Sequence, residues 1–417
     1  MNKPNQAVIL CGGLGTRLKP YTNKYPKPMI QCNGRPFLLY LLKQLSEQGI
    51  KRFILLTGYM GERIEEYFGD GKKWNWKIKY SQGPIEWDTG KRIWEARQSI
   101  DDHFLLLYSD NFVPLVLNKV FKIHEQHKPV LTFVVSEKSP GNIALNIDGI
   151  VQRYDNNRSD DALKYVEIGY MIVEKERILN YFETPNCSLS SILRKMADSD
   201  EVCAYVQEDA YHSISDPIRW KKAEAYLKFK KIILIDRDGV INAKALEGHY
   251  ISQWDEFEWI EDTVKSMKIL SDNGFSFIVI TNQAGIARGM VHKGKMDEMH
   301  QLMVSKLENK GIKVHDIYVC PHHWDDDCKC RKPKAGMFYK ASQDWLMRLD
   351  QVLFIGDDTR DCQAAYNAGC KGIYLGDNSD IHRLHENEKP IYSSQKLSDA
   401  IPTIINFYME KLTYDHY

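Results

Sequence analysis

The stretch IILIDRDGV, residues 232–240, joins a short apolar run to two aspartates and a glycine. A short apolar run bounded by turn residues is typical of a strand that is buried on both faces of a parallel sheet. Two later stretches have the same form, FIVITNQ at 277–283 and VLFIGDDTRD at 352–361. Because strand C-termini meet at one edge of a doubly wound sheet, we expect the polar ends of these strands to converge in a crevice.

The polar residues at these strand ends are suited to phosphoryl transfer. They are Asp236, Asp238, Thr281, Asn282, Asp357 and Asp361. Carboxylates gathered in one crevice repel one another unless a hard cation lies between them, and Mg²⁺ prefers such oxygen ligands. Asp236 can attack phosphorus, and Asp238 can serve as acid and then as base. Thr281 and Asn282, with a lysine, can bind the phosphoryl oxygens. The alternative is that each aspartate only caps a helix, but three such strand ends in order favour the functional interpretation.

The composition predicts two α/β domains in a cytoplasmic protein. A chain of 417 residues exceeds one ordinary core. The 56 basic residues equal the 56 acidic ones, which argues against a nucleic-acid or membrane-surface partner. The sequence has no apolar run near the roughly 18 residues of a membrane span and no signal-peptide pattern at its start. Apolar runs alternate with amphipathic segments and restart at IILIDRDGV, which predicts domains 1–228 and 229–417.

The stretch CPHHWDDDCKCRKP, residues 320–333, holds three of the nine cysteines. Its C-x-H-x₅-C-x-C spacing offers four soft ligands for tetrahedral Zn²⁺, namely Cys320, His322, Cys328 and Cys330. Four protein ligands leave no open position, so this zinc loop should be structural and should direct Arg331 and Lys332 into the phosphate site. His323 in place of His322 and redox-active thiols are the alternatives, although a C-x-C pair is geometrically poor for a disulfide.

Four motifs in the second domain resemble those of haloacid-dehalogenase-superfamily phosphatases. In chain order they are DRDGVIN, TNQAGIARG, CRKPKAGM and GDDTRDCQAAYNAG, within residues 231–376. The resemblance is to the branch of D-glycero-D-manno-heptose 1,7-bisphosphate phosphatases and their histidinol-phosphatase relatives. It implies that Asp236 is the nucleophile and Asp238 the general acid and base. It also implies a Mg²⁺ site made by Asp236, Asp357 and the Asp238 backbone carbonyl, a phosphate-binding Lys332, and zinc on the Cys/His loop.

A glycine-rich stretch, LCGGLGTRLKPYTNKYPKPM at residues 10–29, follows the first apolar run. Such a turn brings backbone N–H groups to phosphates, and the following helix N-terminus favours anions. Arg17 and Lys27 add two cations for a triphosphate, and Asp110, at the end of another strand, can hold Mg²⁺. Together these residues predict attack of a sugar phosphate on an α-phosphorus with pyrophosphate leaving. A dinucleotide-binding or merely structural loop is the alternative.

The first domain is similar to the sugar-1-phosphate nucleotidyltransferases over residues 7 to about 225. The resemblance implies a Rossmann-like nucleotidyltransferase fold, Mg²⁺ on Asp110, and a nucleotide site made of Gly12, Gly13, Gly15, Thr16, Arg17 and Lys27. The chain departs from the family at RYDNNR (153–158) and WDTGKRI (87–93). It also has Ser213 where relatives carry a second metal-binding aspartate, and Asp216 lies nearby but out of register.

Together the two domains predict a bifunctional enzyme of nucleotide-activated heptose synthesis for lipopolysaccharide or capsule. The second domain would remove the 7-phosphate of a heptose 1,7-bisphosphate, and the first would couple the heptose 1-phosphate to a nucleotide, with GTP as first choice. In one rival hypothesis only the phosphatase is catalytic and the first domain is a sensor or oligomerisation module, which Ser213 favours. In another the substrate is a different sugar 1-phosphate. The sequence leaves the base, the anomer and a homo-oligomer open.

Overall fold

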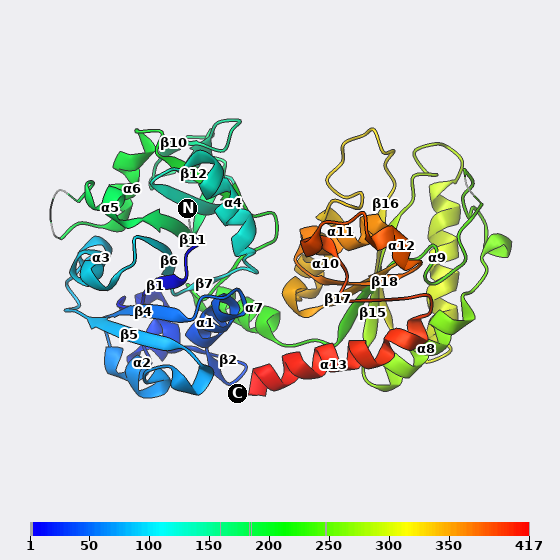
Figure 1. The fold of residues 1–417 in the computed structure, drawn as a ribbon, viewed down its shortest axis with the longest axis horizontal. Helices are drawn as coiled ribbons and strands as arrows, with labels where there is room; N and C mark the ends of the chain where they lie inside the picture. The colour runs from blue at the N-terminus through cyan, green and yellow to red at the C-terminus, as the bar shows by residue number, and fades with distance from the viewer. Residues whose placement is uncertain (1–2, 159, 183, 185, 247, 417) are drawn as a thin grey trace. The chain divides into compact units, whose positions relative to one another are not determined.

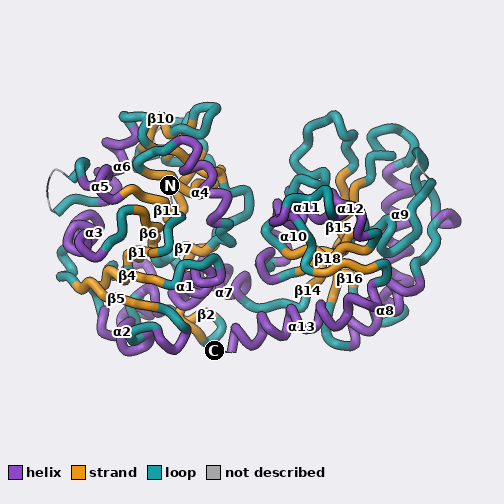
Figure 2. Tube along the Cα trace, in the orientation of Figure 1, coloured by secondary structure: helices purple, strands orange, loops and turns teal. Residues whose placement is uncertain are grey.

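The computed structural model describes residues 3–158, 160–182, 184, 186–246 and 248–416. The chain divides into two compact units, Met1–Leu227 and Lys228–Tyr417, each with a central sheet and helices packed around it (Figures 1 and 2). The division falls in the stretch where the sequence predicts the domain boundary, between α7 (Pro217–Leu227) and β14 (Ile232–Ile235). The expected two-domain α/β organisation is confirmed.

The first unit is built on a nine-stranded sheet that contains β10, β9, β11, β6, β1, β4 and β5 in this order, with β8 beside β11 and β12 beside β8. The strands are β1 (Gln6–Leu10), β4 (Arg52–Thr57), β5 (Lys77–Gln82), β6 (His103–Tyr108), β8 (Leu131–Glu137), β9 (Ile143–Leu145), β10 (Val151–Tyr154), β11 (Tyr165–Glu174) and β12 (Val202–Val206). Strands β5, β4, β1 and β6 are parallel, and β11 runs antiparallel to β6. Since the chain passes from β1 outward to β5 and then back to β6, the loops after β1 and β6 border one crevice.

The helices of the first unit cover a sheet whose central strands are buried on both faces. They are α1 (Phe37–Glu47), α2 (Gly61–Phe68), α3 (Thr89–Ala96), α4 (Leu117–His127), α5 (Lys175–Leu179), α6 (Leu189–Ala197) and α7. All of β1 is buried, and its alternate residues Val8 and Leu10 belong to one apolar cluster with Ile93 of α3 and Leu193 of α6. Two short ladders complete the unit, β2 (Gln31–Cys32) with β3 (Arg35–Pro36) and β7 (Asn111–Phe112) with β13 (His212–Ser213).

The second unit is a six-stranded parallel sheet in the order β16, β15, β14, β17, β18, β19. Its strands are β14, β15 (Ser276–Asn282), β16 (Val314–Cys320), β17 (Leu353–Gly356), β18 (Lys371–Leu375) and β19 (Tyr392–Ser394). Its helices are α8 (Glu261–Asp272), α9 (Lys293–Glu308), α10 (Gly336–Trp345), α11 (Thr359–Ala368), α12 (Asn378–Ile381) and α13 (Leu397–His416). The order reverses between β14 and β17, so the switch point lies at the ends of these two strands.

The side chains of β14 show why this sheet is covered on both faces. Ile233 and Ile235 pack in one apolar cluster with residues of α8, α9 and α13, whereas Ile232 and Leu234 pack in another with residues of α10 and α11. Successive side chains of a strand point to opposite faces, so an uninterrupted apolar run must be buried on both. In the part of the chain that the structure describes, none of the helices is long and apolar enough to cross a membrane.

Candidate active sites

The ends of β14, β15 and β17 line a cavity of about 160 Å³ in the second unit. The lining includes the residues that the sequence places there, Asp236, Asp238, Thr281, Asn282, Arg331, Lys332, Asp357 and Asp361. It also includes residues that the sequence analysis missed, Lys244, Tyr250, Asp358 and Arg360. Arg360 lies inside the quoted motif GDDTRD, so its position beside two aspartates could have identified it from the sequence. Lys244 and Tyr250 come from the loop after β14, where no sequence pattern marks them.

Lys332 is the central cation of this cavity. Its side chain is only 3% exposed, and its Nζ lies 2.9 Å from Asp236 Oδ1 and 2.8 Å from Asp361 Oδ1. Burial alone would lower the pKa of Lys332, but the charges of Asp236 and Asp361 outweigh it and raise the pKa above its usual value. The site therefore holds a fixed positive charge before any substrate binds.

Three carboxylates, those of Asp236, Asp357 and Asp361, come together at the switch point, with one oxygen of each within 4.8 Å of the others. Burial raises the pKa of Asp236 to about 7 and that of Asp357 to about 6, against the opposing charges of Lys332 and Lys244. Among the described residues, Asp357 Oδ1 is buried and has no hydrogen-bond partner. An orphaned oxygen beside two other carboxylates fits a divalent cation with oxygen ligands.

The loop after β14 approaches Asp357 closely. Gly239 has a φ of +87°, and a Cβ atom there would lie 1.8 Å from Asp357 Oδ2, so only glycine fits. From the same loop, Lys244 Nζ lies 2.6 Å from that oxygen although half of the lysine side chain is exposed. Lys244 therefore supplies a mobile positive charge to the carboxylates.

Asp361 holds the loop after β17 in place. Its Oδ2 accepts hydrogen bonds from the backbone N–H groups of Asp357 and Asp358, each at 3.1 Å. Asp358 caps α11 in return, and the two form a capping box. This arrangement fixes Asp361 between the helix N-terminus and Lys332. The structure thus groups the Asp361 carboxylate with those of Asp236 and Asp357. The predicted metal set also includes Asp238 through its backbone carbonyl, and this ligand stays a prediction.

The side chain of Asp238 points to a different set of partners. It accepts hydrogen bonds from the buried Arg237 guanidinium at 2.7 Å, from Asn242 Nδ2 at 3.0 Å and from Gln283 Nε2 at 2.7 Å. Burial would raise the pKa of Asp238, but the charge of Arg237 and these hydrogen bonds lower it below its usual value. The Asp238 carboxylate is consequently held ionised and in one orientation.

Asn282 and Thr281 are tied to their neighbours by hydrogen bonds. Asn282 Oδ1 accepts from the Lys332 backbone N–H at 3.1 Å, and its Nδ2 donates to the Lys332 carbonyl at 3.2 Å. Thr281 Oγ1 accepts from Gln283 Nε2 at 2.8 Å, which leaves the hydroxyl proton available. Within the described structure Arg331 Nη1 is buried without a hydrogen-bond partner, and Arg331 is one of the residues that line the cavity.

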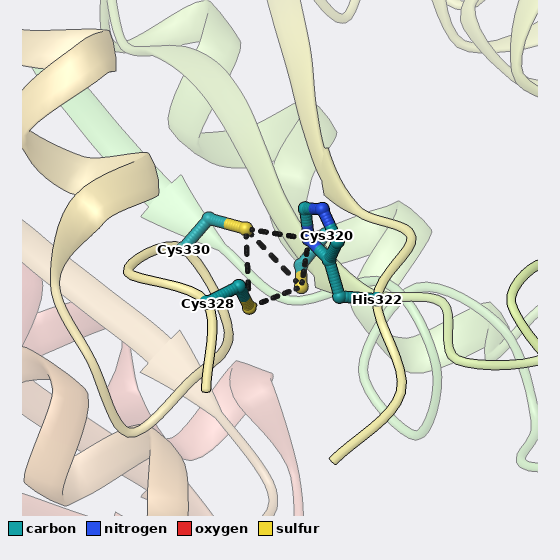
Figure 3. Close-up of side chains that lie close together, drawn as sticks. All are labelled: Cys320, His322, Cys328 and Cys330. Atoms are coloured by element: carbon teal, nitrogen blue, oxygen red, sulfur yellow. Dashed lines mark hydrogen bonds between the residues drawn. The ribbon is translucent and has the colours of Figure 1, made fainter. Parts of the chain in front are cut away.

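Cys320, His322, Cys328 and Cys330 gather in one cluster beside this cavity (Figure 3). Cys330 Sγ lies 3.1 Å from His322 Nδ1, 3.3 Å from Cys320 Sγ and 3.5 Å from Cys328 Sγ. Cys320 Sγ lies 3.7 Å from Cys328 Sγ and from His322 Nδ1. Ligands about 2.3 Å from a tetrahedral zinc ion are roughly 3.7 Å apart, so the donor set fits that ion.

The sequence left two alternatives open at this cluster, namely His323 in place of His322 and redox-active thiols. His323 Nδ1 faces Asp325 Oδ2 at 3.2 Å and its ring contacts Trp324, so the structure places His322 in the cluster and His323 outside it. The three cysteines are unbridged thiols.

The Cys/His cluster connects through the sheet to Asn282 and Lys332, which line the cavity. Cys320 ends β16 opposite Asn282 of β15, and Gln283 N–H donates to the Cys320 carbonyl at 2.8 Å. Cys330 directly precedes Arg331 and Lys332, whose backbone is bound to Asn282. A cross-link between Cys320 and Cys330 would therefore join the end of β16 to the segment that contains Lys332 and fix that segment on the sheet.

The first unit has a wider pocket, of about 310 Å³, at its own switch point. It is lined by Gly12, Gly13, Lys27 and Asp110 from the predicted set, together with Trp87, Asp88, Thr89, Arg92 and Tyr108 among others. Lys27 Nζ forms an ion pair with Asp110 Oδ2. Gly15, Thr16 and Arg17 are not among the lining residues, and Thr16 and Arg17 are exposed.

Arg92 lies directly against the backbone of the glycine-rich loop. The sequence analysis did not identify this residue. It is 4% exposed and donates to the carbonyls of Thr57 at 2.6 Å and Pro84 at 2.7 Å. A Cβ atom on Gly12 would lie 2.4 Å from its guanidinium carbon, so the loop backbone rests directly on this charge. Arg92 lies in WDTGKRI, one of the stretches that differ from the family pattern, but nothing in that stretch indicated these contacts.

The region around Asp110 contains a second carboxylate, that of Glu167. The antiparallel ladder between β11 and β6 reaches Tyr170 and Leu107, and Glu167 lies three residues before Tyr170, close enough to Asp110 for their charges to interact. Asn111 Nδ2 also donates to the Ile168 carbonyl at 3.1 Å. Burial, together with the charge of Asp110, raises the pKa of Glu167 to about 7, against the hydrogen bond from the Gly169 backbone N–H, which lowers it.

Ser213 and Asp216 lie on the other side of Asp110. Ser213 pairs with Asn111 in the β13–β7 ladder, and the next residue, Ile214, donates its N–H to the Asp110 carbonyl at 2.9 Å. Asp216 accepts from the Arg219 backbone N–H at 2.9 Å and forms an ion pair with the Arg219 side chain. Asp216 therefore caps α7 and is not among the residues that line the pocket.

Comparison with known proteins agrees with this division into two sites. Residues 6–211 match the family model described as nucleotidyl transferase, and residues 231–392 match that described as polynucleotide kinase 3 phosphatase. A D-glycero-beta-D-manno-heptose-1,7-bisphosphate 7-phosphatase of Haemophilus ducreyi is 38% identical over 182 residues, 42% of this chain and 98% of that protein. A D-glycero-alpha-D-manno-heptose-1,7-bisphosphate 7-phosphatase of Campylobacter jejuni is 32% identical over 40% of this chain and 98% of that protein.

Among solved structures, HddC from Yersinia pseudotuberculosis complexed with GMP-PN is 24% identical with a TM-score of 0.45 and covers 54% of this chain and 100% of that one. The family models match the two units separately, and the phosphatase relatives are covered almost completely by the second unit. The chain therefore belongs, through its second unit, to the heptose-1,7-bisphosphate 7-phosphatase family, and it is an enzyme that fuses such a phosphatase to a nucleotidyl transferase domain.

Proposed function

We propose that this enzyme makes a nucleotide-activated heptose in two consecutive reactions. The second unit hydrolyses the 7-phosphate of D-glycero-D-manno-heptose 1,7-bisphosphate, and the first unit transfers a nucleotidyl group from GTP to the resulting heptose 1-phosphate. The observation that carries the proposal is the convergence of Asp236, Asp357, Asp361 and Lys332 at one switch point, in a unit that covers 98% of a heptose-bisphosphate phosphatase.

In the phosphatase reaction, an Asp236 oxygen attacks the 7-phosphorus and an aspartyl phosphate forms as the bond to the sugar oxygen breaks. Asp238 protonates that leaving oxygen and then takes a proton from the water that hydrolyses the aspartyl phosphate. The structure favours ionised Asp238, which suits the second step. For the first step Asp238 needs a proton, and the negative charge of a bound phosphate raises its pKa.

The phosphoryl oxygens are bound by cations and donors that the fold holds in advance. Lys332 neutralises their charge, the unsatisfied Arg331 Nη1 donates to them, and the Thr281 hydroxyl proton is available to them. Asn282 acts in part indirectly, because its amide holds the Lys332 backbone. Such donors stabilise the transferring group without rearranging during the reaction.

Mg²⁺ fits the oxygen cluster of this site. Asp236 and Asp357, with the Asp238 backbone carbonyl, would hold the ion, and Asp361 completes the acidic group around it. When bound, Mg²⁺ neutralises charge on the phosphoryl oxygens. Lys244, which contacts Asp357 in the structure, is free to move aside because its side chain is half exposed.

A structural zinc ion is our interpretation of the Cys320, His322, Cys328 and Cys330 cluster. Its distances match a tetrahedral ion, and it lies directly before Arg331 and Lys332 in the chain. The ion would join the end of β16 to the Lys332 segment, so that the phosphate-binding cations keep their positions.

In the nucleotidyl transfer, the backbone of Gly12, Gly13 and Gly15 faces the triphosphate, and Lys27 and Arg17 bind its charge. Asp110 would hold Mg²⁺, which would neutralise charge on the phosphates, and the sugar phosphate oxygen attacks the α-phosphorus with pyrophosphate leaving. The pocket lined by Gly12, Gly13, Lys27 and Asp110 supports these roles. Arg17 and Thr16 are exposed in the structure, so their roles require the loop to close over the bound nucleotide.

A second candidate function for the first unit is a sugar-nucleotide sensor without catalysis. Ser213 favours it, because the position offers no carboxylate and Asp216 is engaged with Arg219. Glu167 favours transfer, because it brings a second carboxylate beside Asp110. The two functions differ in whether pyrophosphate is released.

The test supplies purified full-length protein with heptose 1,7-bisphosphate, Mg²⁺ and each NTP in turn, and identifies the products. We expect phosphate release without NTP, and pyrophosphate release with heptose 1-phosphate and GTP that Asp110→Ala abolishes. Phosphate release from Asp110→Ala at the wild-type rate is the matched control. Nucleotide binding without pyrophosphate release for any sugar phosphate would assign the first unit to the sensor function.

A further inference from the structure

Three potential metal ligands, His103, His124 and Glu174, meet in the first unit away from its nucleotide pocket. Their ligand atoms all lie within 4.8 Å of one another. His103 begins β6 and Glu174 ends β11, and the two are direct partners in the antiparallel ladder. His124 comes from α4, which packs against β8, β11 and β12. Asp110 follows the opposite end of β6, so this cluster is separate from the proposed active site.

Two buried ring nitrogens in this cluster lack hydrogen-bond partners. His124 is 0% exposed, and within the described part of the chain its Nε2 has no hydrogen-bond partner, lying 4.0 Å from Glu174 Oε1. His103 Nδ1 is likewise buried and unpaired among the described residues. Buried polar atoms nearly always have partners, so atoms left unpaired side by side indicate a missing group between them.

The surrounding contacts present lone pairs to the centre of the cluster. His124 Nδ1 lies 2.8 Å from Thr132 Oγ1, and when this nitrogen donates its proton to Thr132, Nε2 carries a lone pair. Arg177 donates to Glu174 Oε2 at 3.3 Å, which leaves Oε1 directed at His124. When the His103 proton is on Nε2, the buried Nδ1 of His103 carries a third lone pair. A water molecule has two protons and cannot satisfy three acceptors, whereas a cation accepts lone pairs from all three.

We propose that His103, His124 and Glu174 bind one divalent transition-metal ion, with Zn²⁺ the best match. Two imidazoles and a carboxylate form a common zinc ligand set, and imidazole nitrogen disfavours Mg²⁺. Tetrahedral ligands about 2.0–2.1 Å from zinc lie roughly 3.4 Å apart, so the 4.0 Å separation requires only a small closure. The ion ties the start of β6, the end of β11 and α4 together, and solvent water fills its fourth position.

The experiment compares metal binding by full-length variants. Chelator-treated protein is titrated with Zn²⁺ in excess Mg²⁺, and bound zinc is counted after dialysis. His124→Gln and Glu174→Gln should each bind one zinc fewer per chain than the wild type. His127→Gln, on the same helix but outside the cluster, should bind as many as the wild type. Equal zinc counts in wild type and Glu174→Gln, or zinc that excess Mg²⁺ displaces from the wild type, would overturn the proposal.

A second measurement separates this site from the Cys/His cluster. Co²⁺ bound by thiolates gives an intense sulfur-to-metal absorption band, whereas Co²⁺ bound by nitrogen and oxygen gives weak visible bands alone. Glu174→Gln should lose one Co²⁺ per chain and keep the thiolate band. Loss of the thiolate band with no change in the nitrogen and oxygen bands would contradict the assignment. Far-UV circular dichroism and thermal unfolding confirm that the first unit of each variant is folded, and Glu174→Gln replaces His124→Gln in the comparison if the latter fails to fold.

Discussion

In the second unit Lys332 contacts two carboxylates and is 3% exposed, whereas in the first unit Lys27 pairs with the single carboxylate of Asp110. The pocket beside Lys27 is about twice as large as the cavity around Lys332. Both sites lie at the ends of two adjacent parallel strands between which the strand order reverses. In the second unit Asp361, Asn282 and the Cys/His cluster fix the charged residues to the sheet. In the first unit Arg92 supports the loop backbone, but Thr16 and Arg17 are exposed.

The same position in an α/β sheet thus holds charged residues that are fixed to the sheet in one unit and a loop with exposed residues in the other. We propose that the site of the second unit is organised in advance and that the site of the first unit is completed by its ligand. A phosphatase needs fixed cations before the phosphoryl group arrives, because donors already in place cost no reorganisation during the reaction. A nucleotide brings its own phosphates and Mg²⁺, which can draw an exposed glycine-rich loop inward. Variants in each unit test this difference.

The largest effect is expected for Asp236→Asn. The amide cannot attack phosphorus, and the metal site loses a charge, so phosphate release should fall on the order of 10³-fold or more. Nucleotidyl transfer should stay unchanged, because the two sites lie on separate sheets. Both products are measured on one preparation. Phosphate release near the wild-type rate would remove Asp236 from the role of nucleophile.

The next largest effect is expected for His322→Ala, which tests how the Cys/His cluster organises the phosphatase site. His322→Ala should release the zinc ion and lower phosphate release about 10- to 100-fold, because Arg331 and Lys332 lose their anchor. His323→Ala is the matched control, since His323 lies next in sequence but outside the cluster, and it should keep both zinc and activity. Zinc content and phosphate release are measured together. Equal loss of zinc in both variants would contradict the ligand set.

The smallest effect is expected for Glu167→Gln, which replaces the buried carboxylate of the first unit. Because the pKa of Glu167 is raised to about 7, folding favours its protonated form, and its contribution to stability is lost as pH rises from its ordinary value of 4.5 through 7. Glu167→Gln should therefore raise the free energy of unfolding of the first unit by about 2 kcal/mol at pH 8 and by little at pH 4.

Urea unfolding of full-length protein at both pH values measures this effect. Glu137→Gln is the control, because Glu137 is exposed and pairs with Tyr165 of the same strand β11. A pH-independent difference between wild type and Glu167→Gln would show that folding leaves the pKa of Glu167 at its ordinary value. Loss of pyrophosphate release in Glu167→Gln would, in addition, support a role for this carboxylate beside Asp110.

The sequence was sufficient to predict the second unit in most of its parts. Its strand-end residues Asp236, Thr281 and Asp357 line one cavity as expected, because a parallel sheet brings the C-termini of its strands to one edge whatever the loops do. The Cys/His cluster was equally predictable, since its four residues lie within eleven positions and short spacing restricts where they can point. In the first unit Gly12, Gly13, Lys27 and Asp110 line the pocket for the same reason.

The tertiary structure alone decided which distant residues meet. Arg92 of α3 meets Gly12, Glu167 comes near Asp110, and His124 reaches Glu174 through the packing of α4. No local pattern marks these residues, because each contact depends on strand register or helix packing between segments dozens of positions apart. By itself the sequence therefore determined the strand ends and the short-range metal motif, where geometry follows from local spacing. The supporting arginine, the second carboxylate and the histidine cluster depend on long-range packing, which only the folded chain specifies.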